Sequence, residues 1–109
     1  MPHWVRVAHI DELLPGQRII TEVEDYFIAV FNLDDEFFCI EDVCTHDGGP
    51  VAEGELDGYA IECPRHGARF DIRTGKVLSF PAVVPVPTFP VKLEDGEIYV
   101  DIAELVGEQ

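Results

Sequence analysis

The sequence predicts an all-β protein, and three observations carry this prediction. Short segments rich in Val, Ile, Phe and Tyr recur at intervals of roughly ten residues, and some of them alternate between apolar and polar residues. Clusters of Asp, Gly and Pro, the residues of tight turns, separate these segments. The length of 109 residues and the apolar content of 47% suit one buried core. We therefore expect a single domain over residues 1–109.

Seven strands are expected, because seven runs of β-forming residues are bounded by turn residues. They cover residues 4–8, 17–23, 26–33, 36–41, 58–63, 89–93 and 97–102. Between the first two, residues 10–14 suit at most a short helical turn, which Pro15 and Gly16 end. Hairpin turns are predicted at Asp34-Asp35 and at Asp95-Gly96, where the glycine adopts positive φ without steric cost, and a further turn is predicted over residues 73–76.

Residues 44–75 differ from the rest of the chain. They are rich in Gly, Pro, Cys and His and lack regular alternation, which indicates a site. The connection that follows cannot be a central strand, because proline removes a ladder donor and four prolines lie here: Pro81, Pro85, Pro87 and Pro90.

The charge of the chain excludes some partners. Twenty-two acids against seven Lys and Arg give a formal net charge of -15, which repels phosphate backbones and anionic membranes. Nucleic acid and membrane are therefore not expected as partners. No apolar run approaches the roughly 18 residues of a membrane span, and the N-terminus lacks the layout of a secretion signal, so we expect a soluble, cytoplasmic protein.

Three cysteines are too few, and odd in number, for a disulfide framework. Two of them instead stand beside histidines, in Cys44-Thr45-His46 and in Cys63-Pro64-Arg65-His66. Two thiolates and two imidazoles make a set of four ligands that either zinc or an iron–sulfur cluster accepts.

The spacing distinguishes these two alternatives. Structural zinc sites usually pair Cys with Cys and His with His, whereas each arm here carries one of each. A two-iron cluster with Cys on one metal and His on the other fits two mixed arms. A structural zinc site or ordinary cysteines remain the alternative interpretation.

The two arms, separated by sixteen residues, resemble the signature of Rieske-type [2Fe-2S] proteins, and the likeness to small soluble Rieske ferredoxins covers residues 5–102. Its flanking motifs are Gly67, Phe70-Asp71, Thr74-Gly75-Lys76, Phe80-Pro81 and Phe89-Pro90-Val91. The resemblance implies a Rieske fold, an antiparallel β-sandwich base with a small cluster-binding subdomain over residues 43–75. It also implies one [2Fe-2S] cluster per chain, its inner iron held by Cys44 and Cys63 and its outer iron, near solvent, by His46 and His66.

The function implied by this resemblance is one-electron transport without catalysis. Such a carrier accepts electrons from a flavin-dependent ferredoxin reductase and passes them to a terminal iron oxygenase of an aromatic-ring-hydroxylating dioxygenase. The chain itself is not expected to be the oxygenase, which needs a second iron held by two His and a carboxylate, since only His3 and His9 remain. The alternatives are the Rieske-like small subunit of an assimilatory nitrite reductase and an accessory ferredoxin of iron–sulfur assembly.

The resemblance also bears on the reduction potential. High-potential members carry a disulfide between the two cluster loops, at positions held here by Gly49 and Arg65, and present Ser and Tyr hydroxyls where this chain has Ala68 and Phe70. We therefore expect a midpoint near the low end of the Rieske range, about -150 mV.

Other residues carry smaller expectations. Cys39 lies within an apolar run and is expected to be a small buried hydrophobe. His3 and His9 are expected at the surface, and the core candidates are Trp4, Tyr26 and Phe27. Arg65, Arg69 and Arg73 are expected to contact a partner or to pair with surface acids.

Residues 44–75 carry the smallest acidic excess, six acids against three bases, so we expect the tip that bears the two histidine ligands to dock on a redox partner. The segment from Pro81 to Pro87 is either edge-strand punctuation or a loop that covers the cluster.

Overall fold

The structure, a computed structural model, describes residues 1–103; residues 104–109 of the expected domain lie outside the described part. This part consists of strands and one short 3-10 turn, and every strand pair is antiparallel, which confirms the all-β prediction. In chain order the elements are β1 (Trp4–His9), η1 (Ile10–Glu12), β2 (Arg18–Val23), β3 (Tyr26–Leu33), β4 (Glu36–Glu41), β5 (Leu56–Asp57), β6 (Ala60–Glu62), β7 (Arg69–Asp71), β8 (Val77–Ser79), β9 (Thr88–Phe89), β10 (Val91–Glu94) and β11 (Glu97–Asp101).

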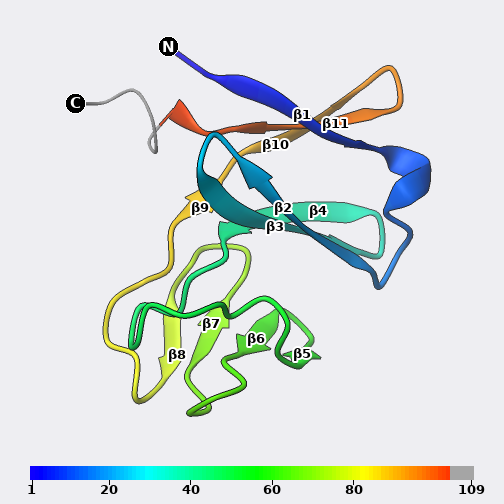
Figure 1. The fold of residues 1–109 in the computed structure, drawn as a ribbon. Coiled ribbons are helices and arrows are strands. Elements are labelled where there is room, and N and C mark those ends of the chain that lie inside the picture. The colour runs from blue at the N-terminus through cyan, green and yellow to red at the C-terminus, as the bar shows by residue number, and fades with distance from the viewer. Residues whose placement is uncertain (104–109) are drawn as a thin grey trace.

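The strands form three sheets within the described residues. A three-stranded sheet has the order β1-β11-β10, and a four-stranded sheet has the order β2-β3-β4-β9. We call these two sheets the base. The third sheet, β5-β6-β7-β8, lies beyond the β2–β4 sheet at the opposite end of the molecule from β1 (Figure 1). Residues 43–87, which contain this third sheet, are called the cluster-bearing region below.

The tight turns of the base follow from the residues at their centres. Two-residue hairpin loops of the favoured type require positive φ at both central positions. The structure shows this at Asp34 and Asp35, with φ of 53° and 69°, and at Asp95 and Gly96, with φ of 54° and 80°. Both predicted hairpins are therefore confirmed. Glu24 and Asp25 make a third turn of this kind, with φ of 51° and 75°.

The expected strand over residues 89–93 is wrong as a single element. Strand β9 pairs with β4, while β10 pairs with β11 in the other sheet. The chain changes sheets at Pro90, which has no N–H to donate to either ladder and accepts from the Asp101 N–H at 3.0 Å. As predicted, residues 80–87 form no strand.

The strands of the cluster-bearing region are short, and sequence periodicity found only one of them. Strands β5, β7 and β8 are two or three residues long, which is too short for alternation to register. The expected strand over residues 58–63 shrinks to β6, because Gly58, with φ of 61°, and Tyr59 form the turn from β5.

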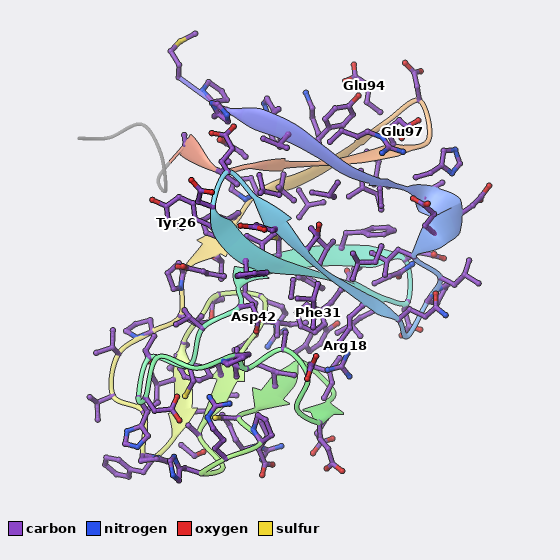
Figure 2. All side chains as sticks on the ribbon, viewed as in Figure 1. Arg18, Tyr26, Phe31, Asp42, Glu94 and Glu97 are labelled. Atoms are coloured by element: carbon purple, nitrogen blue, oxygen red, sulfur yellow. The ribbon has the colours of Figure 1, made fainter. Side chains whose placement is uncertain are left out.

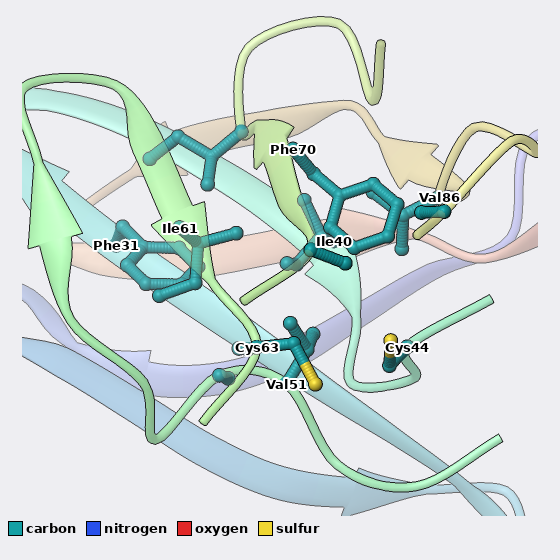
Figure 3. Packing of buried hydrophobic residues seen from close by; sticks show 13 residues of the cluster. Phe31, Ile40, Cys44, Val51, Ile61, Cys63, Phe70 and Val86 are labelled. Carbon is teal, nitrogen blue, oxygen red and sulfur yellow. The ribbon is translucent and has the colours of Figure 1, made fainter. Parts of the chain in front are cut away.

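The β2–β4 sheet is the middle layer of the molecule, and both of its faces are buried. On one face, Ile28 and Val30 of β3 pack with Ile98 and Val100 of the other base sheet. On the opposite face, Ala29 and Phe31 pack against a second cluster that includes Ile61, Phe70, Cys44 and Cys63 (Figure 3). This explains why β3 reads as a continuous apolar run: its alternate side chains face two different cores.

Some single-residue expectations hold and others do not. Cys39 is buried in the base core, as predicted. Trp4 and Phe27 are exposed, so their assignment to the core is wrong, whereas Tyr26 is half-buried. The Lys92 ammonium lies 4.5 Å from the centroid of the Trp4 ring. Phe27, near the start of β3, is on the same face of the strand as Ala29 and Phe31, but only those two are buried in the core. No helix in the described part is long and apolar enough to span a membrane.

Candidate metal centre

The two cysteines that the sequence singles out meet inside the cluster-bearing region. Cys44 follows β4 by three residues and Cys63 follows β6 directly, and their exposed fractions are 0% and 1%. Their sulfurs lie within 4.8 Å of each other, at the margin of the buried cluster (Figure 3). All three cysteines of the chain are free thiols, so this pair is not a disulfide.

Two loops of matching geometry carry these cysteines. The Cys44 N–H donates to the Gly49 carbonyl at 2.6 Å, and the Cys63 N–H donates to the Ala68 carbonyl at 2.7 Å. Each loop is thus closed by a hydrogen bond from the cysteine to the residue five positions later. In each loop a glycine four residues after the cysteine donates back to its carbonyl. These glycines, Gly48 and Gly67, have φ of 80° and 77°, a conformation that a residue with a side chain adopts only with strain.

The histidines lie on the outside of the same loops. His46 and His66 are both exposed, and their ring centroids are 5.3 Å apart with the planes nearly perpendicular, at 86°. The structure therefore separates the four predicted ligands into an inner pair of thiols and an outer pair of imidazoles.

Burial dominates the electrostatics of the inner pair. It raises the pKa of the Cys44 thiol, and the backbone N–H groups of His46 and Asp47, which face this sulfur, act in the opposite direction. N–H groups aimed at a sulfur stabilise negative charge there. Because metals bind thiolates, a metal ion that enters this site displaces protons.

Asp47 is a polar neighbour that the sequence analysis did not single out. Its carboxylate oxygen lies within 4.8 Å of both sulfurs, so geometry alone groups it with Cys44 and Cys63. However, the Asp47 carboxylate accepts from the Arg65 side chain at 2.7 and 2.9 Å and from the Gly49 N–H at 3.0 Å. The Arg65 guanidinium holds the pKa of Asp47 well below its usual range. The only sequence signal for this role is the Asp-Gly-Gly run, which is typical of a side-chain-capped turn.

The donor set fits a centre with two metals better than a single ion. One tetrahedral zinc requires all four donors around one point. Here the thiols converge in the interior, and neither imidazole joins the group of donors that lie within 4.8 Å of one another. Soft thiolates inside and imidazoles outside match a two-iron cluster with different ligands on each iron.

Residues 80–87 pack beside these loops. The Thr45 hydroxyl donates to the Val84 carbonyl, and the Ser79 hydroxyl donates to the Gly67 carbonyl at 3.4 Å. Ala82 and Val86 are buried in the same cluster as the two cysteines. Of the two interpretations of this segment, the structure thus favours the loop that covers the site.

Two side chains at the boundary connect the base to the segment that follows the first loop. Arg18 of β2 donates to the carbonyls of Ala52 and Gly54 at 2.6 and 2.7 Å. Asp42, just after β4, accepts from the N–H groups of Val51 and Ala52 at 2.8 and 2.7 Å. Figure 2 shows Arg18 and Asp42 where the base meets the lower region. The base therefore holds residues 51–54, which follow the first loop directly.

The three arginines of the cluster-bearing region all pair with acids. Arg65 binds Asp47, Arg69 lies 3.3 Å from Asp57, and the Arg73 side chain donates to Asp71 at 2.9 and 3.1 Å. The expectation of surface pairs is therefore confirmed for each of them. His3 and His9 are also at or near the surface and lie far from the site along the chain.

A buried thiol pair and an exposed imidazole pair on matching loops, carried by an antiparallel β fold, define an iron–sulfur electron-transfer protein. The chain matches the Rieske [2Fe-2S] domain over residues 3–90 and belongs to that family. Its cofactor is a Rieske [2Fe-2S] cluster.

Within this family the chain is similar to ferredoxins of dioxygenase systems. It is 46% identical over 100 residues to the 3-phenylpropionate/cinnamic acid dioxygenase ferredoxin subunit of Photorhabdus laumondii subsp. laumondii, covering 90% of this chain and 93% of the relative. A chain in the solved complex of reduced oxygenase and oxidized ferredoxin in carbazole 1,9a-dioxygenase superposes with a TM-score of 0.83 at 38% identity, covering 90% of this chain and 92% of that one.

A second kind of relative has a similar fold at lower identity. The solved structure of a putative NADH-dependent nitrite reductase small subunit from Mycobacterium tuberculosis has a TM-score of 0.76 and 26% identity to this chain. The match covers 93% of this chain and 96% of that one.

Proposed function

We propose that this protein is the ferredoxin component of a ring-hydroxylating dioxygenase system, carrying single electrons from a flavin-dependent ferredoxin reductase to a terminal oxygenase. It is an electron carrier and not itself catalytic. The observation that carries this proposal is the division of the site into buried thiols and exposed imidazoles, because it leaves the cluster insulated on one side and open to a partner on the other.

We assign the ligands accordingly: Cys44 and Cys63 to the inner iron, His46 and His66 to the outer iron, within a cluster-binding subdomain over residues 43–75. A bound [2Fe-2S] cluster supplies reversible one-electron redox chemistry at this point. The protein contributes N–H groups that face the Cys44 sulfur, and the burial of Ala68, Phe70, Ala82 and Val86 excludes water from the thiol side.

We propose that partners dock over the histidine tip through an apolar surface beside it. Phe80 and Val83 are 81% and 72% exposed, and Leu78 and Val84 are also exposed. We call these four residues the tip patch. Hydrogen bonds from Thr45 to Val84 and from Ser79 to Gly67 connect this segment to both ligand loops. Residues 44–75, which include both histidine ligands, carry the smallest acidic excess, so we expect short-range apolar contact with the partner at this end of the molecule. The acidic remainder of the chain steers a basic partner at low salt.

We also place this carrier in the cytoplasm, since three free thiols suit a reducing compartment.

The test of this function is electron transfer in trans. The purified protein is combined with a flavin reductase and a ring-hydroxylating oxygenase, and product formation is measured with and without it. We expect a monomer that supports turnover, and that Phe80→Ser lowers the rate without changing the visible spectrum. As a control, Leu93→Ser alters an exposed apolar residue of β10 in the base.

The nitrite reductase small subunit is the second candidate, favoured by the structural likeness to one such subunit. It predicts stable assembly with a larger reductase chain and no turnover with added oxygenase. That pair of results would replace the carrier proposal.

A further inference from the structure

We infer that Arg65 is a positioning residue whose guanidinium locks the two cluster loops together and thereby sets the placement of the two histidine ligands. This inference rests on the proposed ligand set. It concerns a residue that neither binds metal nor contacts a partner in the proposed function.

The guanidinium spans the two loops. Arg65 belongs to the second loop, between Cys63 and His66, and every acceptor it uses belongs to the first. Its Nε and Nη2 atoms donate to the two Asp47 carboxylate oxygens at 2.7 and 2.9 Å, and its Nη1 atom donates to the Pro50 carbonyl at 2.7 Å. This is a bidentate pair with a further charge-assisted bond, the arrangement in which arginine gives both strength and geometry.

A glycine makes room for this contact. A Cβ atom built on Gly49 would lie 2.9 Å from the Arg65 Cζ and Nη2 atoms, which is closer than real Cβ contacts allow. Gly49 is not among the glycines with positive φ, so its backbone conformation does not require glycine. Glycine is required here because a side chain would collide with Arg65. The guanidinium therefore lies directly against the backbone of the first loop.

The position of the bridge explains why it bears on the ligands. Asp47 directly follows His46, and Arg65 directly precedes His66, so the bridge joins the immediate neighbours of both imidazoles. A single exposed ion pair contributes little to stability. Three directed hydrogen bonds between two loops that share no strand pairing instead restrict how far the two histidines can separate.

The experiment compares three variants of the holoprotein with a control. Arg65→Met removes all three hydrogen bonds. Arg65→Lys keeps the charge but loses the planar guanidinium that binds both carboxylate oxygens at once. Gly49→Ala leaves Arg65 intact and displaces it. The control is Arg69→Met, because Arg69 has the same exposed side-chain fraction, 36%, and its ion-pair partners among residues 1–103 are acids of β5 and β6. The readouts are the rate of cluster loss to a chelator, followed by visible absorbance, and the electron paramagnetic resonance spectrum and midpoint potential of the reduced protein.

We expect Arg65→Met and Gly49→Ala to lose the cluster at least several-fold faster than the parent and to show broadened or shifted resonance lines and a shifted midpoint. Arg65→Lys should fall between them and the parent, and Arg69→Met should match the parent. If both Arg65→Met and Gly49→Ala retain the parent's rate, spectrum and midpoint, the inference is wrong. If Arg65→Met does not fold, Gly49→Ala and Arg65→Lys decide. A parent protein without an iron–sulfur signal would instead refute the proposed function.

Discussion

The base and the cluster-bearing region are held together in different ways. In the base, β2, β3 and β4 pair over continuous registers of six residues each, and the core between the sheets contains almost only apolar side chains. In the cluster-bearing region, strands are two or three residues long, and single side chains such as Asp42, Arg18 and Arg65 close the loops. Its core contains two thiols.

This difference shows where the stability of each region originates. Backbone ladders and apolar burial suffice for the base. The cluster-bearing region buries Cys44 and Cys63 where hydrophobic residues would otherwise pack, and we expect metal binding to supply part of its folding free energy. The proposed function uses the same division, since the strand-paired base presents a small region organised around the cofactor.

The largest effect is expected from removing an inner ligand. Cys63→Ser should abolish the cluster and, with it, the ordered structure of residues 43–87, because metal binding and folding are coupled there. The base should keep its strands. Hydrogen exchange of the backbone amides, measured region by region, is the direct readout, and uniform protection in both regions would contradict the comparison. Cys39→Ala, which alters the buried thiol of the base, should retain the cluster.

The next effect concerns the junction between the two regions. Arg18→Met should lower the free energy of unfolding by about 1–3 kcal/mol, because it leaves the buried carbonyls of Ala52 and Gly54 without their donor. Arg6→Met is the matched control: Arg6 pairs with Glu97 in the open, where solvent screens the charges, so its loss is expected to cost much less stability than the loss of Arg18. Urea unfolding of both variants measures the difference, and equal midpoints would show that Arg18 does not hold the regions together.

A smaller effect is expected on the reduction potential. Phe70 and Ala68 are fully buried in the core that contains both cysteines. Neither side chain has a hydroxyl, so neither can donate a hydrogen bond to a sulfur. Phe70→Tyr should raise the midpoint if the new hydroxyl donates to a sulfur, without changing the stability of the base. Redox titration followed by visible absorbance tests this. A parent midpoint above about +100 mV would contradict the expected low-potential class.

The smallest effect concerns the chain ends of the base. The His3 and Ala103 N–H groups donate to the Asp101 carboxylate and lower its pKa. A carboxyl whose pKa is lower in the folded than in the unfolded protein stabilises the fold at pH values above its unfolded pKa, about 3.9. This stabilisation is lost as the pH falls through the pKa of the folded state. Asp101→Asn should therefore lower Tm slightly at pH 7, and the difference from the parent should shrink toward pH 3. A difference that grows on acidification would have the wrong sign.

The sequence predicted the base better than the cluster-bearing region, for a physical reason. Long strands repeat their pattern, and the Asp-Asp and Asp-Gly turns depend on residues adjacent in sequence, so local reasoning finds both. The strands β5, β7 and β8 pair with their neighbours along the chain, but each is too short for a pattern to repeat. The sheet change at Pro90 depends on two different partner strands, β4 and β11.

The site shows the same contrast. The four ligand candidates stand in two short motifs and could be identified directly. From the sequence, Gly49 and Arg65 are notable only because high-potential relatives carry a disulfide at these positions. In the structure, the Arg65 guanidinium lies against the Gly49 backbone, where a side chain would otherwise be. That contact joins residues sixteen positions apart and has no local signature.

We have assigned two histidines and two cysteines as the ligands of one two-iron cluster. Pulsed electron paramagnetic resonance of the reduced protein, grown with nitrogen-15 histidine, tests it most directly. With this ligand set, we expect hyperfine couplings from two histidine nitrogens, one of which disappears in His46→Cys and the other in His66→Cys. A colourless zinc protein, or an iron–sulfur signal without histidine nitrogen couplings, would contradict it.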